Sequence, residues 1–480
     1  MIKIPYTRGI FCNRTLNLRA IPVIGYDMDY TLVHYKVEAW EGLAYQYIKK
    51  YLKKDGWPVD DLVFDPSIFI RGLLIDKELG NIVKVNRFGY VKAAYHGTHR
   101  LEFEKMREVY SRTIVDLADT RYAFLNTLFS ISEACMFSQL VDLLDAGKIT
   151  GILGYADLAH RIRTVLDHAH LEGDLKNEIM AHPEKFVELD PDLPLTLLDQ
   201  RHANKKLLLI TNSGWKYSKF MMSYICDRYL PKGMDWRDLF DLIVVSARKP
   251  SFFTAKPPMF EIVDNDDGLL KPVIGEIKKN GCYLGGNASM IEEYLGVSGE
   301  QILYVGDHLF CDVSISKEVL RWRTALIIRE LEEELEAIES ARKDHKQIRK
   351  MMQEKEELEG QIRHKQLILQ RREKKYAGKV KENPTDIKSE LRQLRDDLHE
   401  LDVQIGELNV RDSKRFNSNW SYLMRTGNDK SKFTRQVERY ADIYTSRVSN
   451  MLYYTPFMYF RSPRGSIPHD PVFYPEDLKE

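Results

Sequence analysis

The stretch that decides the fold is Ile21–Tyr35, which reads IPVIGYDMDYTLVHY. Its apolar first half ends in Tyr26, and two aspartates follow, Asp27 and Asp29, with one residue between them. A short run rich in Ile and Val without polar alternation is typical of a parallel strand that is buried on both faces. The two carboxylates are therefore expected at the end of a buried strand, where the chain leaves the sheet.

Three further apolar runs have the same design, and a fifth, RTALII from Arg323, completes the predicted sheet. In open α/β sheets, ligands bind beyond the carboxyl ends of the strands, where all these polar residues fall. The sequence therefore predicts a Rossmann-like α/β core with a parallel sheet, made of residues 1–42 and 201–330. The three runs and the residues after them are KKLLLI before Thr211, Asn212 and Ser213, LIVVS before Lys249, and QILYVG before Asp307 and Asp312.

A long insertion, residues 43–200, separates the first predicted strand from the second. Within it, residues 69–97 contain Gly-Asn and Phe-Gly turn signals between alternating runs, which predict a small β element. Apolar spacing predicts helices over residues 120–147 and 155–180. We expect a mostly helical cap inserted into the core.

The composition changes over residues 331–412, where Glu, Lys, Arg, Gln and Leu dominate. Gly378 and Pro384 indicate a turn, so we predict a charged, coiled-coil-like helical hairpin; a solvated helix without a partner is the alternative. Residues 413–480 are predicted to form a helical segment on the core or at an oligomer interface. The hairpin prediction rests on a coiled-coil series with spacings of four and three: Ile387, Leu391, Leu394, Leu398, Leu401, Ile405 and Leu408.

Bulk properties exclude several classes of protein. The chain has 71 basic and 71 acidic residues, which gives no global attraction for nucleic acid or an anionic membrane. The five cysteines are scattered without a C-x-x-C pair, so we expect a reducing compartment, no disulfide framework and no zinc knuckle. Signal-peptide and membrane-span patterns are not found, and a soluble cytoplasmic protein is the expectation.

The residues at the strand ends suit phosphoryl transfer. A carboxylate such as Asp27 can attack phosphorus, and Asp29 can protonate the leaving oxygen if its pKa rises from about 3.9 to about 7, which requires about 4 kcal/mol. Asp27, Asp307 and the backbone carbonyl of Asp29 offer oxygen ligands for Mg²⁺, and Asp312 can orient a bound water. Each motif alone is also common as a turn, a helix cap or a loop. Their ordered conjunction favours a phosphatase.

This ordered set resembles the haloacid dehalogenase superfamily of phosphotransferases. Longer stretches, among them NRTLNLRAIPVIGYDMDYTLVHY, FIRGLLIDKELGNIVKV and QVERYADIYTSRVSNMLYY, are similar to the cytosolic purine 5′-nucleotidases, the IMP–GMP-specific group. The resemblance runs from about Asn13 to Tyr454. It implies Mg²⁺-dependent hydrolysis of IMP and GMP through an aspartyl-phosphate, with phosphate transfer to another nucleoside as a further activity. It makes Asp27 the nucleophile, Asp29 the acid/base, Thr211, Asn212 and Lys249 the phosphate ligands, Asp307 a metal ligand, Asp312 a supporting residue and Ser213 a neighbour of the sugar or phosphate.

The cap offers candidates for substrate recognition. Arg163, Asp167 and His170 are spaced by four and three and share one helix face. The spacing alone favours a surface ion pair, whereas the resemblance to the family's base-recognition helix favours contact with a purine through Arg163 and Asp167. Lys176 is expected over the ribose or phosphate, and Phe129 is a candidate for stacking on the base, although a helical Phe is more often core.

The chain departs from the family in places and leaves alternatives open. Asp116 and Asp119 stand where the family's nucleotide effector site has basic residues, whereas Asn126 matches, so a nucleotide effector stays open. A homo-oligomer is expected. One alternative is a phosphatase of the same superfamily acting on a sugar phosphate or pyrimidine nucleotide. The other is a coiled-coil interaction protein with a vestigial phosphatase core, which the intact acid, Thr and Lys set disfavours.

Overall fold

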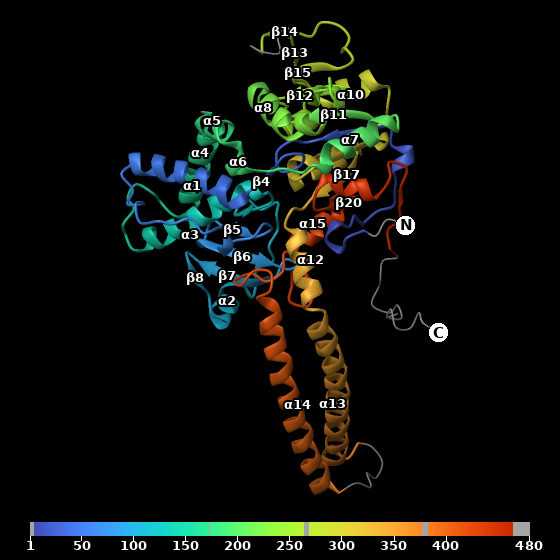
Figure 1. Cartoon of the computed structure of the whole chain (residues 1–480). Coiled ribbons are helices and arrows are strands. Elements are labelled where there is room, and N and C mark those ends of the chain that lie inside the picture. Colours follow the sequence, from blue (N-terminus) through green and yellow to red (C-terminus); the bar gives the residue numbers. More distant parts are fainter. Residues whose placement is uncertain (1–3, 172, 264–267, 377–382, 464–480) are drawn as a thin grey trace.

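The computed structural model describes residues 4–171, 173–263, 268–376 and 383–463 (Figure 1). Its centre is a ten-stranded, mostly parallel sheet with the order β1-β20-β17-β16-β3-β11-β12-β15-β13-β14. The five runs chosen from the sequence all lie in it, as β3 (Val23–Tyr26), β11 (Lys206–Ile210), β12 (Leu242–Val245), β16 (Ile302–Gly306) and β17 (Arg323–Ile327). The predicted α/β class and the central strands are confirmed.

The register of the sheet decides where the polar residues meet. Tyr26 of β3 lies beside Leu209 of β11 on one side and Val305 of β16 on the other, in parallel pairing. All four residues of β3 are buried, as expected for a strand covered on both faces. The carboxyl ends of these three neighbouring parallel strands therefore lie along one edge of the sheet, and the chain leaves each strand there.

Five strands of the sheet were not predicted from the sequence. The structure places β1 (Phe11–Cys12), β13 (Met259–Ile262), β14 (Leu270–Pro272), β15 (Gly281–Gly285) and β20 (Ile443–Thr445) at its two sides. Five helices of the core lie between strands of this sheet in the chain: α7 (Asp192–His202), α8 (Trp215–Cys226), α10 (Ala288–Leu295), α11 (Ile315–Leu320) and α15 (Lys432–Tyr440).

The inserted cap joins the core through a pair of short strands. The chain leaves the core along β4 (His34–Tyr35) and returns along β10 (Val187–Glu188), and these strands pair antiparallel. The cap contains helices α1 (Val37–Lys54), α3 (Ile131–Asp145), α4 (Tyr155–Leu171) and α5 (Asp174–Ala181). It also contains a five-stranded antiparallel sheet that lies beside the helices (Figure 1). Its strands, in the order β8-β7-β6-β5-β9, are His99–Arg100, Val91–His96, Asn81–Val85, Leu74–Asp76 and Tyr122–Phe124.

The helix predicted over residues 120–147 is wrong in its first part. Residues Tyr122–Phe124 form β9, which pairs with β5 (Leu74–Asp76), and the helix begins only at Ile131. Backbone pairing with β5 overrides the apolar spacing, which continues without a break from strand to helix.

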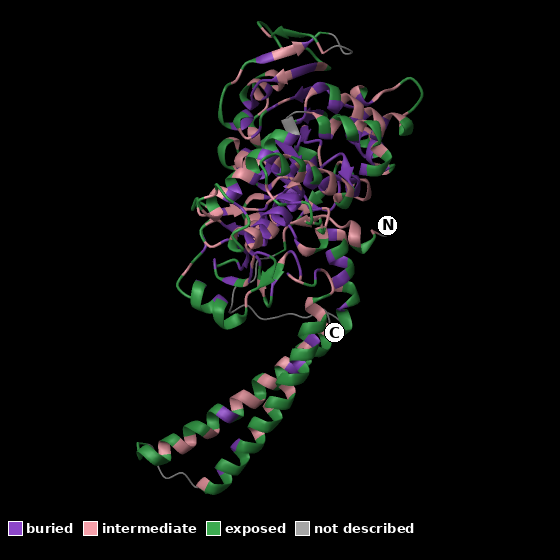
Figure 2. Cartoon of the chain, turned by 90° about the vertical axis from the view of Figure 1, so that its left-hand side faces the viewer, coloured by how far each residue is buried: buried purple, intermediate pink, exposed green. Residues whose placement is uncertain are grey.

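Beyond the core, two long helices project from the body of the molecule (Figure 1, Figure 2). After α12 (Leu331–Ser340), α13 (Arg342–Lys374) and α14 (Pro384–Ser413) run side by side. Two small apolar clusters join them, around Met351 with Ile405 and around Ile362 with Leu391. Most other residues of the two helices are exposed to solvent (Figure 2). Gly378 of the predicted turn lies outside the described residues.

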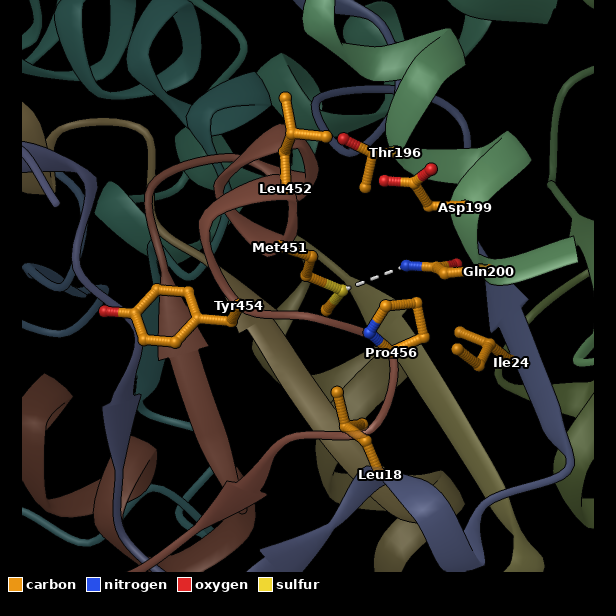
Figure 3. Close-up of a pocket in the computed structure, with 9 residues that line it drawn as sticks. All are labelled: Leu18, Ile24, Thr196, Asp199, Gln200, Met451, Leu452, Tyr454 and Pro456. Carbon is orange, nitrogen blue, oxygen red and sulfur yellow. Dashed lines mark hydrogen bonds between the residues drawn. The ribbon is translucent and has the colours of Figure 1, made fainter. Parts of the chain in front are cut away.

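The segment after the hairpin returns to the core. It forms α15 and then β20, which pairs parallel with β17 and antiparallel with β1. A 3-10 helix, Val448–Tyr453, then packs on α7 and β3 around a small pocket of about 10 Å³ (Figure 3). The side chain of Gln200 donates to the sulfur of Met451 there, at 3.3 Å. This pocket has room for about one water molecule, so it is a packing feature rather than a substrate site.

Residues 464–480 of the predicted C-terminal segment lie outside the described residues. Within the described part, none of the helices combines the length and the apolar character needed to cross a membrane.

Candidate active site

Three buried carboxylates gather at the edge of the sheet. Asp27 follows β3, Asp307 follows β16, and Asp312 lies in the short helix Leu309–Ser314; one oxygen from each lies within 4.8 Å of the others. The ammonium group of Lys249 lies 2.7 Å from Asp27 Oδ1 and 2.7 Å from Asp312 Oδ1. The structure thus brings four of the predicted site residues together from three strand ends.

The cluster holds more negative charge than its lysine can balance. Burial raises the pKa of Asp27 to about 7, since the opposing effect of Lys249 is offset in part by Asp312 and Asp29. Burial, with Asp312 and Asp27, also raises the pKa of Asp307 well above its usual range. A divalent cation with a preference for oxygen ligands would relieve this crowding, so the donor set fits Mg²⁺.

The cap contributes two side chains that hold Asp307, neither of which the sequence analysis selected. Thr127 Oγ1 donates to Asp307 Oδ2 at 3.0 Å. Arg71 is 1% exposed, donates to the backbone carbonyl of Asp307 at 3.2 Å, and pairs with Glu330 at 2.7 Å. The sequence contained one signal for Arg71, which is a charged residue inside the apolar stretch FIRGLL. A charge in such a stretch is expected to be buried and therefore to require polar partners.

Asp29 occupies a separate hydrogen-bonding environment beside the cluster. Its Oδ1 accepts from the hydroxyl of Tyr35 and its Oδ2 from the hydroxyl of Ser213, each at 2.6 Å. Lys176 of the cap helix α5 donates to the same Ser213 hydroxyl at 3.1 Å. Asp29, Ser213 and Lys176 therefore lie together, and Tyr35 joins them without having been predicted.

The loop after β11 is coupled to the loop that carries Lys249. The side chain of Asn212 donates to the backbone carbonyl of Lys249 at 3.1 Å and accepts from its N–H at 2.6 Å. Thr211 is buried, and its hydroxyl accepts from the N–H of Ser213 at 3.1 Å. Asn212 thus holds the lysine loop in place, a role that its predicted contact with phosphate did not include.

A cleft of about 430 Å³ lies between the cap and the loop that follows Asp307. Arg163 lines it and pairs with Glu133 at 2.9 Å, and its Nε lies 3.5 Å from Asp167 Oδ1. The cleft reaches the acid cluster through Thr127, which lines it and binds Asp307. Glu133 was not predicted, although it is the buried partner that directs Arg163.

The remaining predicted cap residues have other surroundings. Phe129 packs on Tyr30 and Trp40, with ring centroids 4.6 and 4.8 Å apart, in an aromatic cluster rather than on the cleft wall. Asn126 lines the cleft beside Thr127. The side chain of His170 lies outside the described residues.

Comparison with known proteins shows which family the chain resembles in sequence. A model of the 5′ nucleotidase family matches residues 10–472. A 5′-nucleotidase domain-containing protein from Dictyostelium discoideum is 27% identical over 471 residues, which cover 96% of this chain and 75% of that protein. 5′-Nucleotidase domain-containing protein 2 from Homo sapiens is 27% identical over 493 residues, covering 98% and 86%.

Solved structures are less similar. A predicted phosphoglycolate phosphatase from Haemophilus somnus matches with a TM-score of 0.27 and 14% identity, over 64% of this chain and 85% of that one. A similarity this low adds nothing to the strand order and the site geometry described above.

Proposed function

This chain belongs to the 5′ nucleotidase family and is a 5′-nucleotidase, and from this premise we propose that it hydrolyses purine nucleoside monophosphates with Mg²⁺. IMP and GMP are the proposed substrates, and nucleoside and phosphate are the products. The observation that supports the proposal best is the buried cluster of Asp27, Asp307 and Asp312 around Lys249, beside a cleft lined by Arg163.

The reaction has two steps at phosphorus. A carboxylate oxygen of Asp27 attacks the phosphorus, the bond between phosphorus and O5′ breaks, and Asp29 gives its proton to O5′ as the nucleoside leaves. Water then attacks the aspartyl-phosphate while Asp29 accepts a proton from it, and the bond to Asp27 breaks, which releases phosphate. A second nucleoside in place of water would receive the phosphate, which is the proposed transfer activity.

The groups around Asp27 bind and orient the phosphate. Lys249 supplies a fixed positive charge, and the hydroxyls of Thr211 and Ser213 lie on the same edge of the sheet, where Lys176 also reaches from the cap. Asn212 acts on this set chiefly through the lysine loop that it holds. Phosphoryl transfer depends mainly on such positioning and on stabilisation of charge.

Asp27, Asp307 and the backbone carbonyl of Asp29 are the proposed ligands of Mg²⁺, and Asp312 supports the site. When bound, Mg²⁺ would neutralise the carboxylates and polarise the phosphate. The crowding of three buried carboxylates around one lysine supports this assignment.

We place the purine in the cleft between the cap and the core. Arg163 can donate to O6 or N7, and Asp167 can accept from N1–H, which an adenine does not offer. His170 and Phe129 stay candidates for base contacts, although Phe129 would have to leave its aromatic cluster to stack on the base. A nucleotide effector near Asn126 and a homo-oligomer are further parts of the proposal.

The test is phosphate release from IMP, GMP, AMP, UMP and a sugar phosphate, with Mg²⁺ and with EDTA, for the wild type and Asp27→Asn. Mg²⁺-dependent release from IMP and GMP, abolished in the variant, is the expected result. Release from the sugar phosphate or UMP alone would keep the chemistry and refute the purine pocket. No release from any substrate would point first to an unmet requirement for a nucleotide effector. Release that stays absent when nucleotide effectors are added would contradict the proposal and favour the interaction protein.

A further inference from the structure

Both carboxylate oxygens of Asp29 accept a hydrogen bond, Oδ1 from the hydroxyl of Tyr35 and Oδ2 from the hydroxyl of Ser213. The Oδ2 side, bound by Ser213, faces the groups that we assign to phosphate, because Lys176 shares the same hydroxyl. Tyr35 and Ser213 are both buried, at 3% and 5% exposed, but the hydroxyl of Tyr35 meets the hydroxyl of Tyr217 instead of Lys176. The two oxygens of Asp29 are therefore not equivalent.

The hydroxyl of Tyr35 is held as a donor to Asp29. The hydroxyl of Tyr217 lies 3.0 Å from that of Tyr35, and it must donate if the single proton of Tyr35 goes to Asp29. Burial, together with Asp29 and Tyr217, raises the pKa of Tyr35 well above its usual value, so its hydroxyl keeps the proton. Tyr35 thus places a hydrogen-bond donor at Oδ1.

The ring of Tyr35 has little freedom to move. It packs edge-on against Tyr30, with centroids 5.2 Å apart, and against Trp40 at 5.8 Å. Its backbone is paired with Val187 in the two-strand connection between core and cap. Packing and backbone pairing both hold the hydroxyl at one place.

We propose that Tyr35 is a positioning residue, which orients the carboxyl group of Asp29 so that Oδ2 carries the proton to the leaving oxygen. The inference rests on the proposed function, since it assumes that Asp29 protonates O5′. Tyr35 touches neither the substrate nor the phosphorus, and it acts through Asp29. A hydroxyl fixed at Oδ1 restricts rotation of the carboxyl group and so holds Oδ2 in one direction, beside Ser213, and proton transfer depends on such a fixed direction.

Substrates with different leaving groups separate this role from general damage. The alkoxide of a nucleoside needs a proton as it leaves, whereas 4-nitrophenolate is weakly basic and does not. The measurement is kcat/KM, which covers the steps up to leaving-group release, for IMP and for 4-nitrophenyl phosphate with wild type and Tyr35→Phe. We expect Tyr35→Phe to lose about tenfold or more with IMP, mainly in kcat, and less than about threefold with the aryl ester.

A matched control is Tyr454→Phe, which removes a hydroxyl that accepts from the N–H of Ile10 at 3.2 Å beside the pocket of Figure 3. It should change both substrates by less than about twofold, within the usual range for a peripheral hydrogen bond. Equal losses of Tyr35→Phe on both esters, or no loss on either, would overturn the positioning role while leaving the proposed function intact. A wild type that cleaves neither ester would overturn the proposed function and this inference with it.

Discussion

At the scale of single residues, the site is dominated by buried negative charge. One carboxylate oxygen from each of Asp27, Asp307 and Asp312 lies within 4.8 Å of the others, and Lys249 is the lysine among them. Burial and the neighbouring carboxylates raise the pKa values of Asp27 and Asp307. A carboxylate whose pKa is higher in the folded protein than in the unfolded chain favours folding at low pH. The stability that it contributes is lost as pH rises from about 4, the unfolded value, to about 7, the value of Asp27 in the fold.

Magnesium should reverse this loss, because it binds the ionised carboxylates. We expect the increase in melting temperature caused by Mg²⁺ to be larger at about pH 8 than at about pH 6, since fewer protons compete at the higher pH. Thermal unfolding at both pH values, with Mg²⁺ and with EDTA, measures it. Asp27→Asn should show a smaller increase, whereas an equal increase at both pH values would contradict the role of these carboxylates.

The proposed preference for 6-oxopurines should depend on Asp167. Asp167→Asn offers an amide that can donate to N1 of adenine, so the ratio of kcat/KM for IMP to that for AMP should fall by about tenfold or more. Steady-state kinetics with both nucleotides give the ratio, and Asp174→Asn at the start of α5 is a control for the loss of one charge on the cap. An unchanged ratio would exclude Asp167 from the base pocket.

Sequence reasoning found the residues that carry a recognisable motif and missed those that support them. Asp27 and Asp307 stand directly after apolar runs, so local pattern locates them. Thr127 and Arg71 contact Asp307 only because the cap folds back over 180 residues or more, and local pattern contains nothing about that contact. Tyr35 lay inside the quoted motif, but its role follows only from the position of its hydroxyl.

At the scale of elements, the same distinction holds for the strands. The five central strands are mostly apolar because both faces are covered, and this makes them visible in the sequence. β20 has only three residues, and β1 only two, so neither is long enough to show a periodic pattern. Their place in the sheet depends on pairing with strands that are distant in the sequence.

The end of β16 leaves no space for a side chain. A Cβ atom on Gly306 would lie 2.5 Å from the side chain of Asp312, which is closer than real contacts allow. Gly306→Ala should therefore displace Asp312 and lower kcat by about tenfold or more, because small shifts of catalytic groups are costly.

The control for this substitution lies on α13, where a Cβ atom on Gly360 meets nothing within 4 Å. Gly360→Ala should leave kcat unchanged and stabilise the helix by up to about 1 kcal/mol. Kinetics and thermal unfolding of both variants provide the comparison. Full activity in Gly306→Ala would show that Asp312 is not held against β16 during turnover.

At the scale of the whole molecule, the hairpin and the catalytic body are nearly separate. The hairpin is held by its own clusters and by ion pairs such as Lys355 with Asp402, and at its base Asp344 pairs with Arg411. None of the residues that we place in the site belongs to α13 or α14. We therefore expect the body, which contains all the residues of the proposed site, to catalyse the reaction without the distal part of the hairpin.

Replacing residues 347–408 by a short Gly-Ser linker should keep kcat/KM for IMP within about threefold, because the ends of the deleted part lie side by side. Kinetics give the first result, and light scattering of both proteins gives the oligomeric state. If the hairpin joins copies of the chain, the shortened protein will have a lower mass in solution. A large loss of activity in a folded protein would contradict the separation of hairpin and site.

The pairing of β20 between β17 and β1 has a consequence for how the chain is made. More than a hundred residues, including both long helices, separate the end of β17 from β20, and a ribosome adds such a stretch in about 5–25 s. During that time the edge of β17 that faces away from β16 has no neighbouring strand. The N-terminal strand β1 can pair with β20 only after almost the entire chain has been made. The last strand of this sheet to be synthesised therefore completes it and pairs with the first strand of the chain. A nascent chain stopped within the hairpin exposes an open sheet edge to its neighbours.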